Sequence, residues 1–580
     1  MKPRAAIVQR RTESAVTETL HPVGLLDRLL KQRGVLSARE LDFALAELPG
    51  YEKLPAIEPA VDRLQAALEQ QQRITVIGDY DCDGATSTAL ALLALQQFGA
   101  SDVNYLVPNR FEFGYGLSAA IVDVAAERQP ALLLTVDNGV ASNEGVARAN
   151  ALGIDVVVTD HHLPPEELPA AVAIVNPNLD GCEFQSGALA GVGVIFYLML
   201  ALRARLKRNG YFDASRPEPR LADLLDLVAI GTVADVVPLD QVNRTLVEQG
   251  LRRIRAGKTR PGVLALCEVA GRTPQQLSAS DIGFAIGPRL NAAGRLDDIS
   301  VGIQCLLADS RVQAAQLAKE LNSLNQDRRQ IEQGMRKEAD VLVSRTLAAL
   351  PKGQQVMSLC LYEPHWHQGV IGILAGRLKE ELNIPVIVFA ADDPDDSSAD
   401  ISLKGSGRSI PGLHIRDAMM AVAAHSPGLL KKFGGHAMAA GLSLNHSDLA
   451  TFAAAFDVEV RAALDNQAPT RQWITDGSLE LTEFSLENAE LLRFACPWGQ
   501  GFPEPVFDER FTVVSWRLLK ERHMKMQLQP EGSDQVFEAI AFNQRLEDPA
   551  GNTYHMVFRL EVNTFRNRQS LQLQVLYIDS

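Results

Sequence analysis

The chain has 580 residues, which is enough for several separately folded domains. Hydrophobic residues make up 46% and charged residues 22%, with 42 Gly and 29 Pro, and this composition excludes a collagen, a disordered polymer and a coiled-coil rod. The 56 Lys and Arg against 71 Asp and Glu leave a net charge of -15, which excludes a protein that coats duplex DNA through its overall charge. Any contact with nucleic acid must therefore be local.

The cysteines and apolar runs bear on the location of the protein. None of the six cysteines forms a C-x-x-C pair or a tight cluster, which indicates neither a disulfide framework nor a zinc site and fits a reducing cytoplasm. The N-terminus, MKPRAAIVQRRTESAV, lacks an apolar run followed by a small-residue cleavage site, and no later stretch is long and apolar enough to span a bilayer. We therefore predict a cytoplasmic protein with no membrane partner.

The first predicted elements are helical and are followed by a repeated alternation of strand and helix. Residues 1–50 contain the mixed helical patterns VGLLDRLLKQRG and ARELDFALAELPG, which predict a helical lead-in. From Arg73 onward, short β-branched runs such as ITVIGD, ALLLTVDNG and IDVVVTDHH are each followed by a helical stretch. This alternation predicts βα units on a parallel sheet, in an α/β domain over residues 51–308.

Three further parts follow in the chain. Residues 309–350 are dense in mixed charge and lack Pro, which predicts a long solvated helix that connects two domains. Residues 351–468 return to an α/β pattern with MSLCLYE, GVIGILAGRLKEELN and IPVIVFA, interrupted by the acidic loop DDPDDSSAD. Residues 469–580 alternate apolar and polar side chains, as in SLQLQVLYI, and predict a small antiparallel β-barrel or sandwich of about five strands.

Acidic residues gather at the predicted strand ends of the first α/β domain. The carboxyl ends of strands in an open parallel sheet form its ligand crevice. Those ends carry the motifs GDYDCDG, VDNG and TDHH, and a further acid lies in AIGTVADVVPL. The residues concerned are Asp79, Asp81, Asp83, Asp137, Asp160, His161, His162 and Asp235.

Converging carboxylates repel one another, and divalent ions remove that conflict. Several carboxylates with imidazoles and no thiolate favour Mn²⁺ or Mg²⁺ over structural zinc, and two such ions about 3.5–4 Å apart are the usual device for phosphate-ester hydrolysis. The helix ATSTALALLAL is expected to aim its N-terminal N–H groups at the same crevice, where they suit a phosphate. A single D-x-D-G is usually a turn or a cap, and adjacent histidines are usually surface residues, so the inference depends on the three segments occurring together.

These motifs resemble those of the DHH phosphoesterase superfamily, and GPRLNAAGR, SGRS and FGGHAMAAG resemble its RecJ branch of single-strand-specific exonucleases. The resemblance covers residues 70 to 580 and implies a DHH domain, a DHHA1 domain and a single-strand-binding OB-like domain in that order. It implies two ions held by Asp81, Asp83, Asp137, His161 and Asp235, with Asp137 as the bridge. It also implies catalytic roles for these residues and for Asp160 and His162, the latter as a contact to the substrate phosphate.

One position departs from the family pattern. Many members carry a histidine four residues before the D-x-D motif, and this chain has Ile77 there. We expect Asp79 to replace that histidine at the first metal. The departure also disfavours the similar manganese pyrophosphatases.

The same resemblance suggests residues that contact the strand. In the second domain these are Ser406, Gly407, Arg408 and Ser409, whose guanidinium, hydroxyls and glycine suit a phosphate, and Gly435 with His436. Others are Arg110, Arg289, Asn291 and Arg295 in the first domain, and Trp516 with Arg517 in the β module. Against these roles, an isolated arginine is by default a surface ion pair, a G-G-H is more often a turn, and Trp516 is equally suited to a core.

The sequence thus predicts an enzyme that removes mononucleotides from single-stranded DNA in the 5′→3′ direction. The resemblance alone implies the polarity, the DNA preference, the setting in repair and recombination, and partners such as a single-strand-binding protein and a helicase. Two alternatives stay open. One is a phosphodiesterase of short oligonucleotides or cyclic dinucleotides, which would not need the β module, and the other is a non-catalytic DNA-binding scaffold, which would not need the carboxylates.

Overall fold

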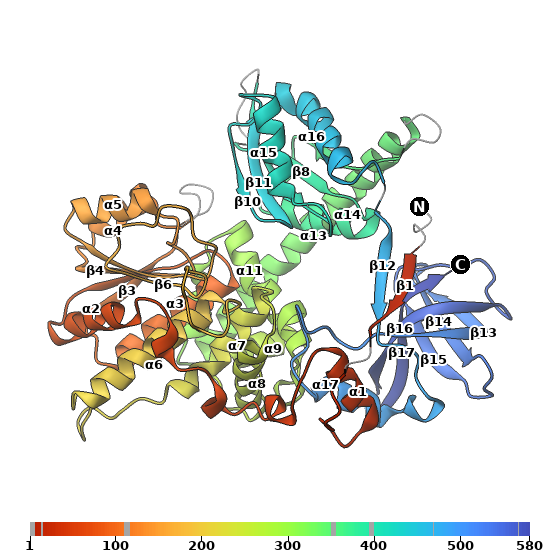
Figure 1. The fold of residues 1–580 in the computed structure, drawn as a ribbon, viewed down its shortest axis with the longest axis horizontal. Coiled ribbons are helices and arrows are strands. Elements are labelled where there is room, and N and C mark those ends of the chain that lie inside the picture. The colour runs from red at the N-terminus through yellow and green to blue at the C-terminus, as the bar shows by residue number, and fades with distance from the viewer. Residues whose placement is uncertain are drawn as a thin grey trace.

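A computed structural model describes residues 6–12, 15–108, 116–349, 355–393, 400–467, 469–566 and 568–579. Figure 1 shows three bodies: an α/β body with many helices, a smaller α/β body, and a barrel beside which both termini lie. A long helix, α13 (Arg311–Ala349), runs from the first body to the second. The predicted order of an α/β domain, a connecting helix, a second α/β domain and a β module is confirmed.

The first body is built on a parallel sheet whose strands lie in the order β3-β2-β4-β5-β6. The second strand of this sheet in chain order, β3, thus lies at one edge, and the strand order reverses between β2 and β4. Such a reversal opens a crevice at the carboxyl ends of those two strands. The strands are β2 (Ile74–Ile77), β3 (Val103–Leu106), β4 (Leu132–Val136), β5 (Asp155–Thr159) and β6 (Ala173–Val175).

Helices cover both faces of this sheet, because alternate strand residues point to opposite sides. Leu133, Val156 and Val158 pack in one apolar cluster with the first pair of helices, whereas Leu134 and Val157 belong to the main core on the other face. The first pair is α4 (Ala119–Ala126) and α5 (Asn143–Ala151), and the main-core helices are α2 (Ile57–Glu69), α3 (Cys82–Gln97) and α6 (Gly191–Arg208).

A helical layer extends this main core towards the centre of the molecule (Figure 1). Two of its members turn out to position the strand-end acids: α7, which ends beside Asp235, and α11, which contains GPRLNAAGR. The layer comprises α7 (Leu225–Ala234), α8 (Gln241–Arg255), α9 (Pro261–Val269), α10 (Ala279–Asp281), a π-helical turn η6 (Ile282–Ile286), α11 (Gly287–Leu296) and α12 (Ser300–Leu307).

Helix α13 joins two cores rather than lying free in solvent. Its first half buries Ala314, Ala318 and Leu321 in the main core, and its second half buries Met335 and Ala339 in a core of the second α/β body. The prediction of a connecting helix is confirmed. The prediction of a solvated helix is wrong along this buried stripe, because the mixed charge occupies only the remaining faces.

The second α/β body contains a mixed sheet in the order β10-β11-β9-β8-β7, in which only β7 and β8 are parallel. Part of the predicted acidic loop, residues 394–399, lies outside the described residues. The elements are β7 (Leu359–Tyr362), α14 (Ile371–Leu382), β8 (Val386–Ala391), β9 (Ser402–Arg408), α15 (Ile415–His425), β10 (Lys432–Gly435), β11 (Ala439–Asn445) and α16 (Leu449–Ala463).

The C-terminal β module is a closed five-stranded barrel in the order β13-β14-β15-β17-β16. The predicted strand number is confirmed. The antiparallel prediction is wrong at one ladder, because β15 and β17 pair in parallel to close the barrel. The strands are β13 (Phe507–Leu519), β14 (His523–Pro530), β15 (Phe537–Ala541), β16 (Thr553–Phe565) and β17 (Arg568–Asp579), with α17 (Leu486–Phe494) beside them.

The N-terminal segment differs from the predicted helical lead-in. Its first described element is a strand, β1 (Ala6–Arg10), which pairs in parallel with β12 (Arg471–Thr475) beside the barrel, and only then does α1 (Gly24–Gln32) follow. Figure 1 shows this pair between the second body and the barrel. The strand has no neighbour nearby in the sequence, and its partner lies more than 460 residues away, so local periodicity could not reveal it. Short 3₁₀ turns follow at Ala38–Leu41, Leu45–Glu47 and Tyr51–Lys53.

Candidate metal centre and strand-binding residues

The acids predicted at the strand ends do meet in the crevice between β2 and β4. Ligand atoms of Asp79, Asp81 and Asp137 lie within 4.8 Å of one another, as do those of Asp83, His161 and Asp235. A third such group contains Asp137, His161 and His162, so Asp137 and His161 each belong to two groups. This convergence follows from the reversal of strand order, which places the loops after β2, β4 and β5 side by side.

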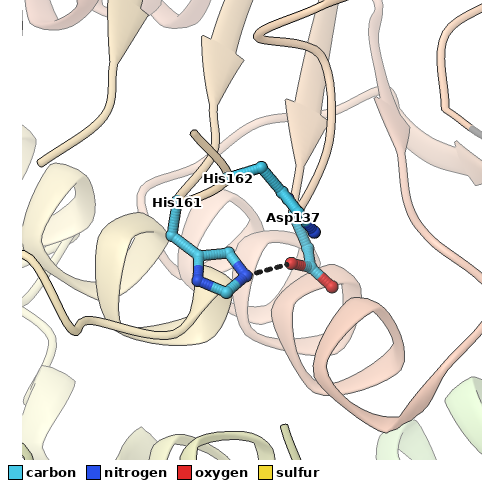
Figure 2. Close-up of side chains that lie close together, drawn as sticks. All are labelled: Asp137, His161 and His162. Carbon is cyan, nitrogen blue, oxygen red and sulfur yellow. Dashed lines mark ion pairs between the residues drawn. The ribbon is translucent and has the colours of Figure 1, made fainter. Parts of the chain in front are cut away.

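His161 lies at the centre of this arrangement. Its Nε2 is 3.1 Å from Oδ1 of Asp137 and 3.5 Å from Oδ2 of Asp235. Figure 2 shows the His161 ring pointing towards the Asp137 carboxylate, each side chain coming from the end of its own strand. Asp137 has a φ of 63°, a left-handed conformation that is uncommon outside glycine but that aspartate adopts more readily than most residues.

The electrostatics of the cluster call for a cation. Burial, and then the negative charge of Asp235 and Asp81, raise the pKa of Asp83 well above its usual range, and burial with Asp83 and Asp81 does the same to Asp137. The pKa of Asp235 is raised to about 7 by burial and by Asp81. Burial, and then the charge of His162, lower the pKa of His161 to about 4, so its imidazole is neutral.

These residues fit divalent metal ions. Buried carboxylates that repel one another, with a neutral imidazole among them, are a hard donor set of the kind that Mn²⁺ and Mg²⁺ accept. The position of the family histidine, Ile77, is fully buried in an apolar cluster and offers no ligand atom. Asp79 lies with Asp81 and Asp137, where the sequence predicted a replacement for that histidine.

Asp160 positions His162. One of its oxygens lies 2.7 Å from Nδ1 of His162, and the backbone N–H groups of Val140, His161 and His162 also donate to this carboxylate. Burial acts against protonation of His162, but the hydrogen bond and charge of Asp160 outweigh it and raise the pKa of His162 to about 9. Asp160 belongs to none of the three metal groups formed by the described residues.

The predicted role of the α3 N-terminus in phosphate binding is wrong. Oδ1 of Asp81 accepts hydrogen bonds from the N–H groups of Asp83 and Gly84, and Oδ1 of Asn291 accepts one from Cys82. The first N–H groups of the helix are thus used within the protein. Asp81 acts as a helix cap and also offers a ligand atom, so the two interpretations of D-x-D-G apply together.

The GPRLNAAGR segment supports the D-x-D loop from behind. At Gly294, an added Cβ would lie 1.7 Å from the carbonyl oxygen of Tyr80, so only glycine lets α11 approach this loop. Asn291 binds the same loop, as described above. Arg289 is buried, and its donors bind Asn322, the Ala285 carbonyl and the Val269 carbonyl, so its predicted contact with the strand gives way to a packing role.

Sequence reasoning missed the helix end that holds Asp83. The N–H groups of Gly191 and Val192, at the start of α6, donate to the two oxygens of Asp83 at 2.6 Å and 3.0 Å. An added Cβ at Gly191 would lie 2.6 Å from Cβ of Asp137, and one at Gly231 would lie 2.7 Å from Oδ1 of Asp83. The glycines themselves, Gly191 at the start of α6 and Gly231 inside α7, were the available signal.

In the second α/β body, SGRS lies at the end of β9. The Arg408 Nη1 donates to Oγ of Ser406 and to the Gly407 carbonyl, and Ser409 Oγ donates to the Leu413 carbonyl. Gly407 was expected to allow a phosphate to approach the backbone, and this role stays a prediction. An added Cβ there would lie 2.7 Å from Ile415 in the core, so helix packing requires the glycine.

The G-G-H turn carries His436, whose ring interacts electrostatically with the histidines of the first body. Gly435 has a φ of 139°, and an added Cβ would lie 2.5 Å from the Ala439 carbonyl oxygen, so the turn itself requires glycine. Partial burial, and then the positive charge of His162, lower the pKa of His436. His162 of the first body and His436 of the second body therefore interact electrostatically.

The remaining predicted strand contacts are spread over the molecule. Arg295 donates to the Gly369 carbonyl and so joins α11 to the second body. Arg517 is exposed on β13, whereas Trp516 is half-buried and packs against the main core. Arg110 lies outside the described residues.

The fold and the acid cluster together define a class: a DHH-type catalytic body joined to a DHHA1-type body, with an added OB barrel. Comparison with known families bears this out. The DHH family N-terminal domain matches residues 73–232, the DHHA1 domain residues 353–462, and the RecJ OB domain residues 475–577.

Similar proteins extend the match to nearly the whole chain. A single-stranded-DNA-specific exonuclease RecJ from Salmonella typhimurium is 50% identical, over 99% of both chains. Its Escherichia coli counterpart is also 50% identical, again over 99% of both. The crystal structure of RecJ in complex with Mn²⁺ from Thermus thermophilus has a TM-score of 0.79 at 28% identity, covering 99% of this chain and 80% of that one. The chain belongs to the RecJ family.

The cysteines and the apolar helices bear on the predicted location of the protein. All six cysteines are free thiols. Within the described part of the chain, no helix combines the length and apolarity that a membrane crossing requires.

Proposed function

We propose that this protein is a metal-dependent exonuclease that degrades single-stranded DNA from its 5′ end and releases mononucleotides. The observation that carries the proposal is the overlap of the three metal groups, in which Asp137 and His161 are shared. The relatives, named as single-stranded-DNA-specific exonucleases, support the substrate. The Mn²⁺ and Mg²⁺ complexes of the Thermus protein support the metal.

Two divalent ions, Mn²⁺ or Mg²⁺, are the proposed cofactors, and Asp137, which belongs to two of the candidate groups, would be a ligand to both. When bound, such ions activate water and stabilise the charge that develops on the phosphate. The chain's own contribution is to hold the ligands rigidly: the α6 N-terminus fixes Asp83, and Asn291 fixes the loop that carries Asp81. The proposed ligands are Asp79, Asp81 and Asp137 for one ion, and Asp83, His161 and Asp235 with Asp137 for the other.

His162 is proposed to contact the scissile phosphate. Asp160 holds the ring through Nδ1, and the pKa of His162, raised to about 9, keeps the ring positively charged, which suits a phosphate oxygen. Arg408 and His436 of the second body are proposed to hold the phosphate at the strand end, since the charge of His162 acts on His436 across the two bodies. Family membership supports the 5′ polarity.

The presence of the barrel favours a single strand of many nucleotides as the substrate over a very short oligonucleotide. Closed five-stranded barrels of this type are common platforms for single strands, and Arg517 is exposed on this one. A phosphodiesterase of dinucleotides would gain nothing from such a module. A non-catalytic scaffold would gain nothing from the buried carboxylate cluster.

Labelled single strands provide the test. A single strand carrying a label at its 5′ or 3′ end is incubated with Mn²⁺ or Mg²⁺, beside a blunt duplex and a dinucleotide. We expect labelled mononucleotide from the 5′-labelled strand at once, shortening of the 3′-labelled strand from its other end, and little cleavage of the duplex. Preferred cleavage of the dinucleotide would support the oligonucleotide phosphodiesterase instead, and binding without cleavage would support the scaffold.

The variant Asp137→Ala tests whether hydrolysis can be lost without unfolding the protein. Removal of the shared carboxylate should abolish hydrolysis while the protein stays folded, because the change also relieves repulsion within the cluster. The exposed Asp534 of the barrel, changed to Ala, is the matched control and should leave the rate unchanged. Near-full activity of Asp137→Ala would contradict the two-metal assignment.

We further propose a cytoplasmic role in DNA repair and recombination, beside a single-strand-binding protein and a helicase. Family membership supports this setting, and the six free cysteines fit a reducing compartment. Co-purification of those two proteins with the tagged chain from DNA-damaged cells would test the partners.

A further inference from the structure

Two local irregularities meet at the C-terminal end of α7. Val236, just beyond Asp235, has a φ of 64°, which is a true outlier for a β-branched residue, and its side chain is 62% exposed. The π-helical turn η6 exposes Phe284, whose side chain is 78% exposed. Strained residues and π-helical turns both concentrate at functional sites.

Close packing ties η6 to the same helix end. An added Cβ at Gly283 would lie 3.6 Å from Cγ1 of Val233, and one at Gly287 would lie 3.1 Å from Cβ of Ala234. Both neighbours belong to the last turn of α7, directly before Asp235. Phe284 follows Gly283, so this exposed residue belongs to the turn that packs against the helix end preceding Asp235.

The other end of this segment touches the C-terminal part of the protein. Arg493 of α17 lies 3.6 Å from Asp281 and donates to the Gln276 carbonyl. The stretch from Gln276 to Gly287 therefore contacts α17, beside the barrel, at one end and the last turn of α7 at the other, and Phe284 lies at the α7 end.

We propose that Phe284 is a stacking residue for a nucleobase of the single strand close to the scissile phosphate, with Val236 extending the apolar surface beside it. This inference rests on the proposed function. An aromatic face accepts any base, so it gives affinity without sequence preference. It also favours single strands, since the bases of a duplex are already stacked and paired and cannot turn onto the ring.

The test combines a protein variant with an altered strand. Phe284→Ala and wild type are compared on a 20-nucleotide strand and on versions that lack one base at each of the first six positions from the 5′ end. Binding is measured by anisotropy in EDTA, which prevents hydrolysis, and KM and kcat are measured with Mn²⁺. Phe284→Tyr keeps the ring, and Leu36→Ala removes another exposed apolar side chain, in the N-terminal segment.

We expect Phe284→Ala to weaken binding and raise KM roughly 5- to 150-fold, the range of one base stacked on one ring. The Mn²⁺ concentration for half-maximal activity should stay unchanged. At one position, loss of the base should weaken wild type by a similar factor and leave the alanine variant unaffected. Phe284→Tyr should restore binding, and Leu36→Ala should match wild type.

The proposal is overturned if Phe284→Ala binds and cleaves every strand within two-fold of wild type. It is also overturned if base removal weakens both proteins equally at every position, because the ring would then not contact a base. Failure of the proposed function gives a different result, namely a wild-type protein that does not cleave the intact strand.

Discussion

Asn291 on α11 accepts a hydrogen bond from the backbone N–H of Cys82, at 2.8 Å, and these residues are 209 positions apart in the chain. This bond ties the helical layer to the loop that carries Asp81 and Asp83. A residue that the motif alone would assign to the DNA strand thus has a structural role in the metal centre.

Asn291→Ala should therefore weaken metal binding more than strand binding. The unsatisfied N–H of Cys82 costs about 1–3 kcal/mol, and the loop then loses its fixed position. The Mn²⁺ concentration for half-maximal activity should rise about 10-fold or more, corresponding to at least ~1.4 kcal/mol. Asn322→Ala, which removes the partner of Arg289 on the other side of α11, is the control and should leave this concentration unchanged. Equal values for the two variants would contradict the role of Asn291.

Gly294→Ala should damage the same loop by sterics. The new methyl group would overlap the Tyr80 carbonyl, so α11 and the loop must separate. We expect a lower melting temperature together with a loss of activity of about 100-fold or more, on the scale of small misplacements of catalytic groups. Gly334→Ala on the exposed face of α13 has open space around its Cβ and should instead stabilise the protein by about 0.5–1 kcal/mol. An active and stable Gly294→Ala protein would refute the close approach.

Arg408→Ala should weaken binding of the substrate and leave binding of the metal ions unchanged. Its guanidinium is positioned by Ser406 and Gly407, and the loss of a charged hydrogen bond to a phosphate costs about 1.5–3 kcal/mol. For a strand with a 5′ phosphate, KM should rise roughly 10- to 150-fold, while the half-activating Mn²⁺ concentration stays the same. Arg345→Ala on the exposed part of α13 serves as the control. A normal KM for Arg408→Ala would remove this residue from the phosphate site.

Asp508 should make the attachment of the N-terminal strand depend on pH. Burial raises the pKa of this carboxyl, but hydrogen bonds with Arg10, Thr475 and His555 outweigh burial and the net pKa is lowered. The stabilisation is therefore present above the ordinary carboxyl pKa and is lost as the pH falls through the lowered value.

Asp508→Asn should consequently lower the thermal midpoint at pH 7, by an amount that reflects about 1–3 kcal/mol. The difference from wild type should begin to shrink below about pH 4, where the carboxyl of the unfolded chain takes up a proton, and should be lost below the lowered pKa of the folded protein. The exposed Asp534, changed to Asn, should show no such difference at either pH. A gap between wild type and Asp508→Asn that is constant from pH 7 to pH 3.5 would exclude the ionised carboxyl as its source.

Much of the metal centre could be predicted from the sequence, because its members follow directly after strands. Asp81, Asp137 and His161 each come at the end of a buried β-branched run, and parallel strands bring such ends to one edge. The pattern of the last domain likewise predicted a five-stranded β module, although its parallel closing ladder could not be predicted from alternation alone.

The remaining features depend on pairs of residues that are distant in the chain. Whether an arginine such as Arg289 reaches solvent or a buried carbonyl depends on which elements pack around it. The residues next to it in the sequence do not predict that choice. The pairing of β1 with β12, and the hydrogen bond from the Gly191 N–H to Asp83, likewise join segments that are distant in the chain.

The sequence by itself determined the domain order, the family motifs and the presence of an acid cluster, because periodicity and the spacing of acids after strands are local properties. Only the tertiary structure decided which side chains hold that cluster in place and which are left to contact a DNA strand. The physical reason is that a buried polar group must find a partner, and the choice of partner is made by packing between segments that the chain order does not bring together.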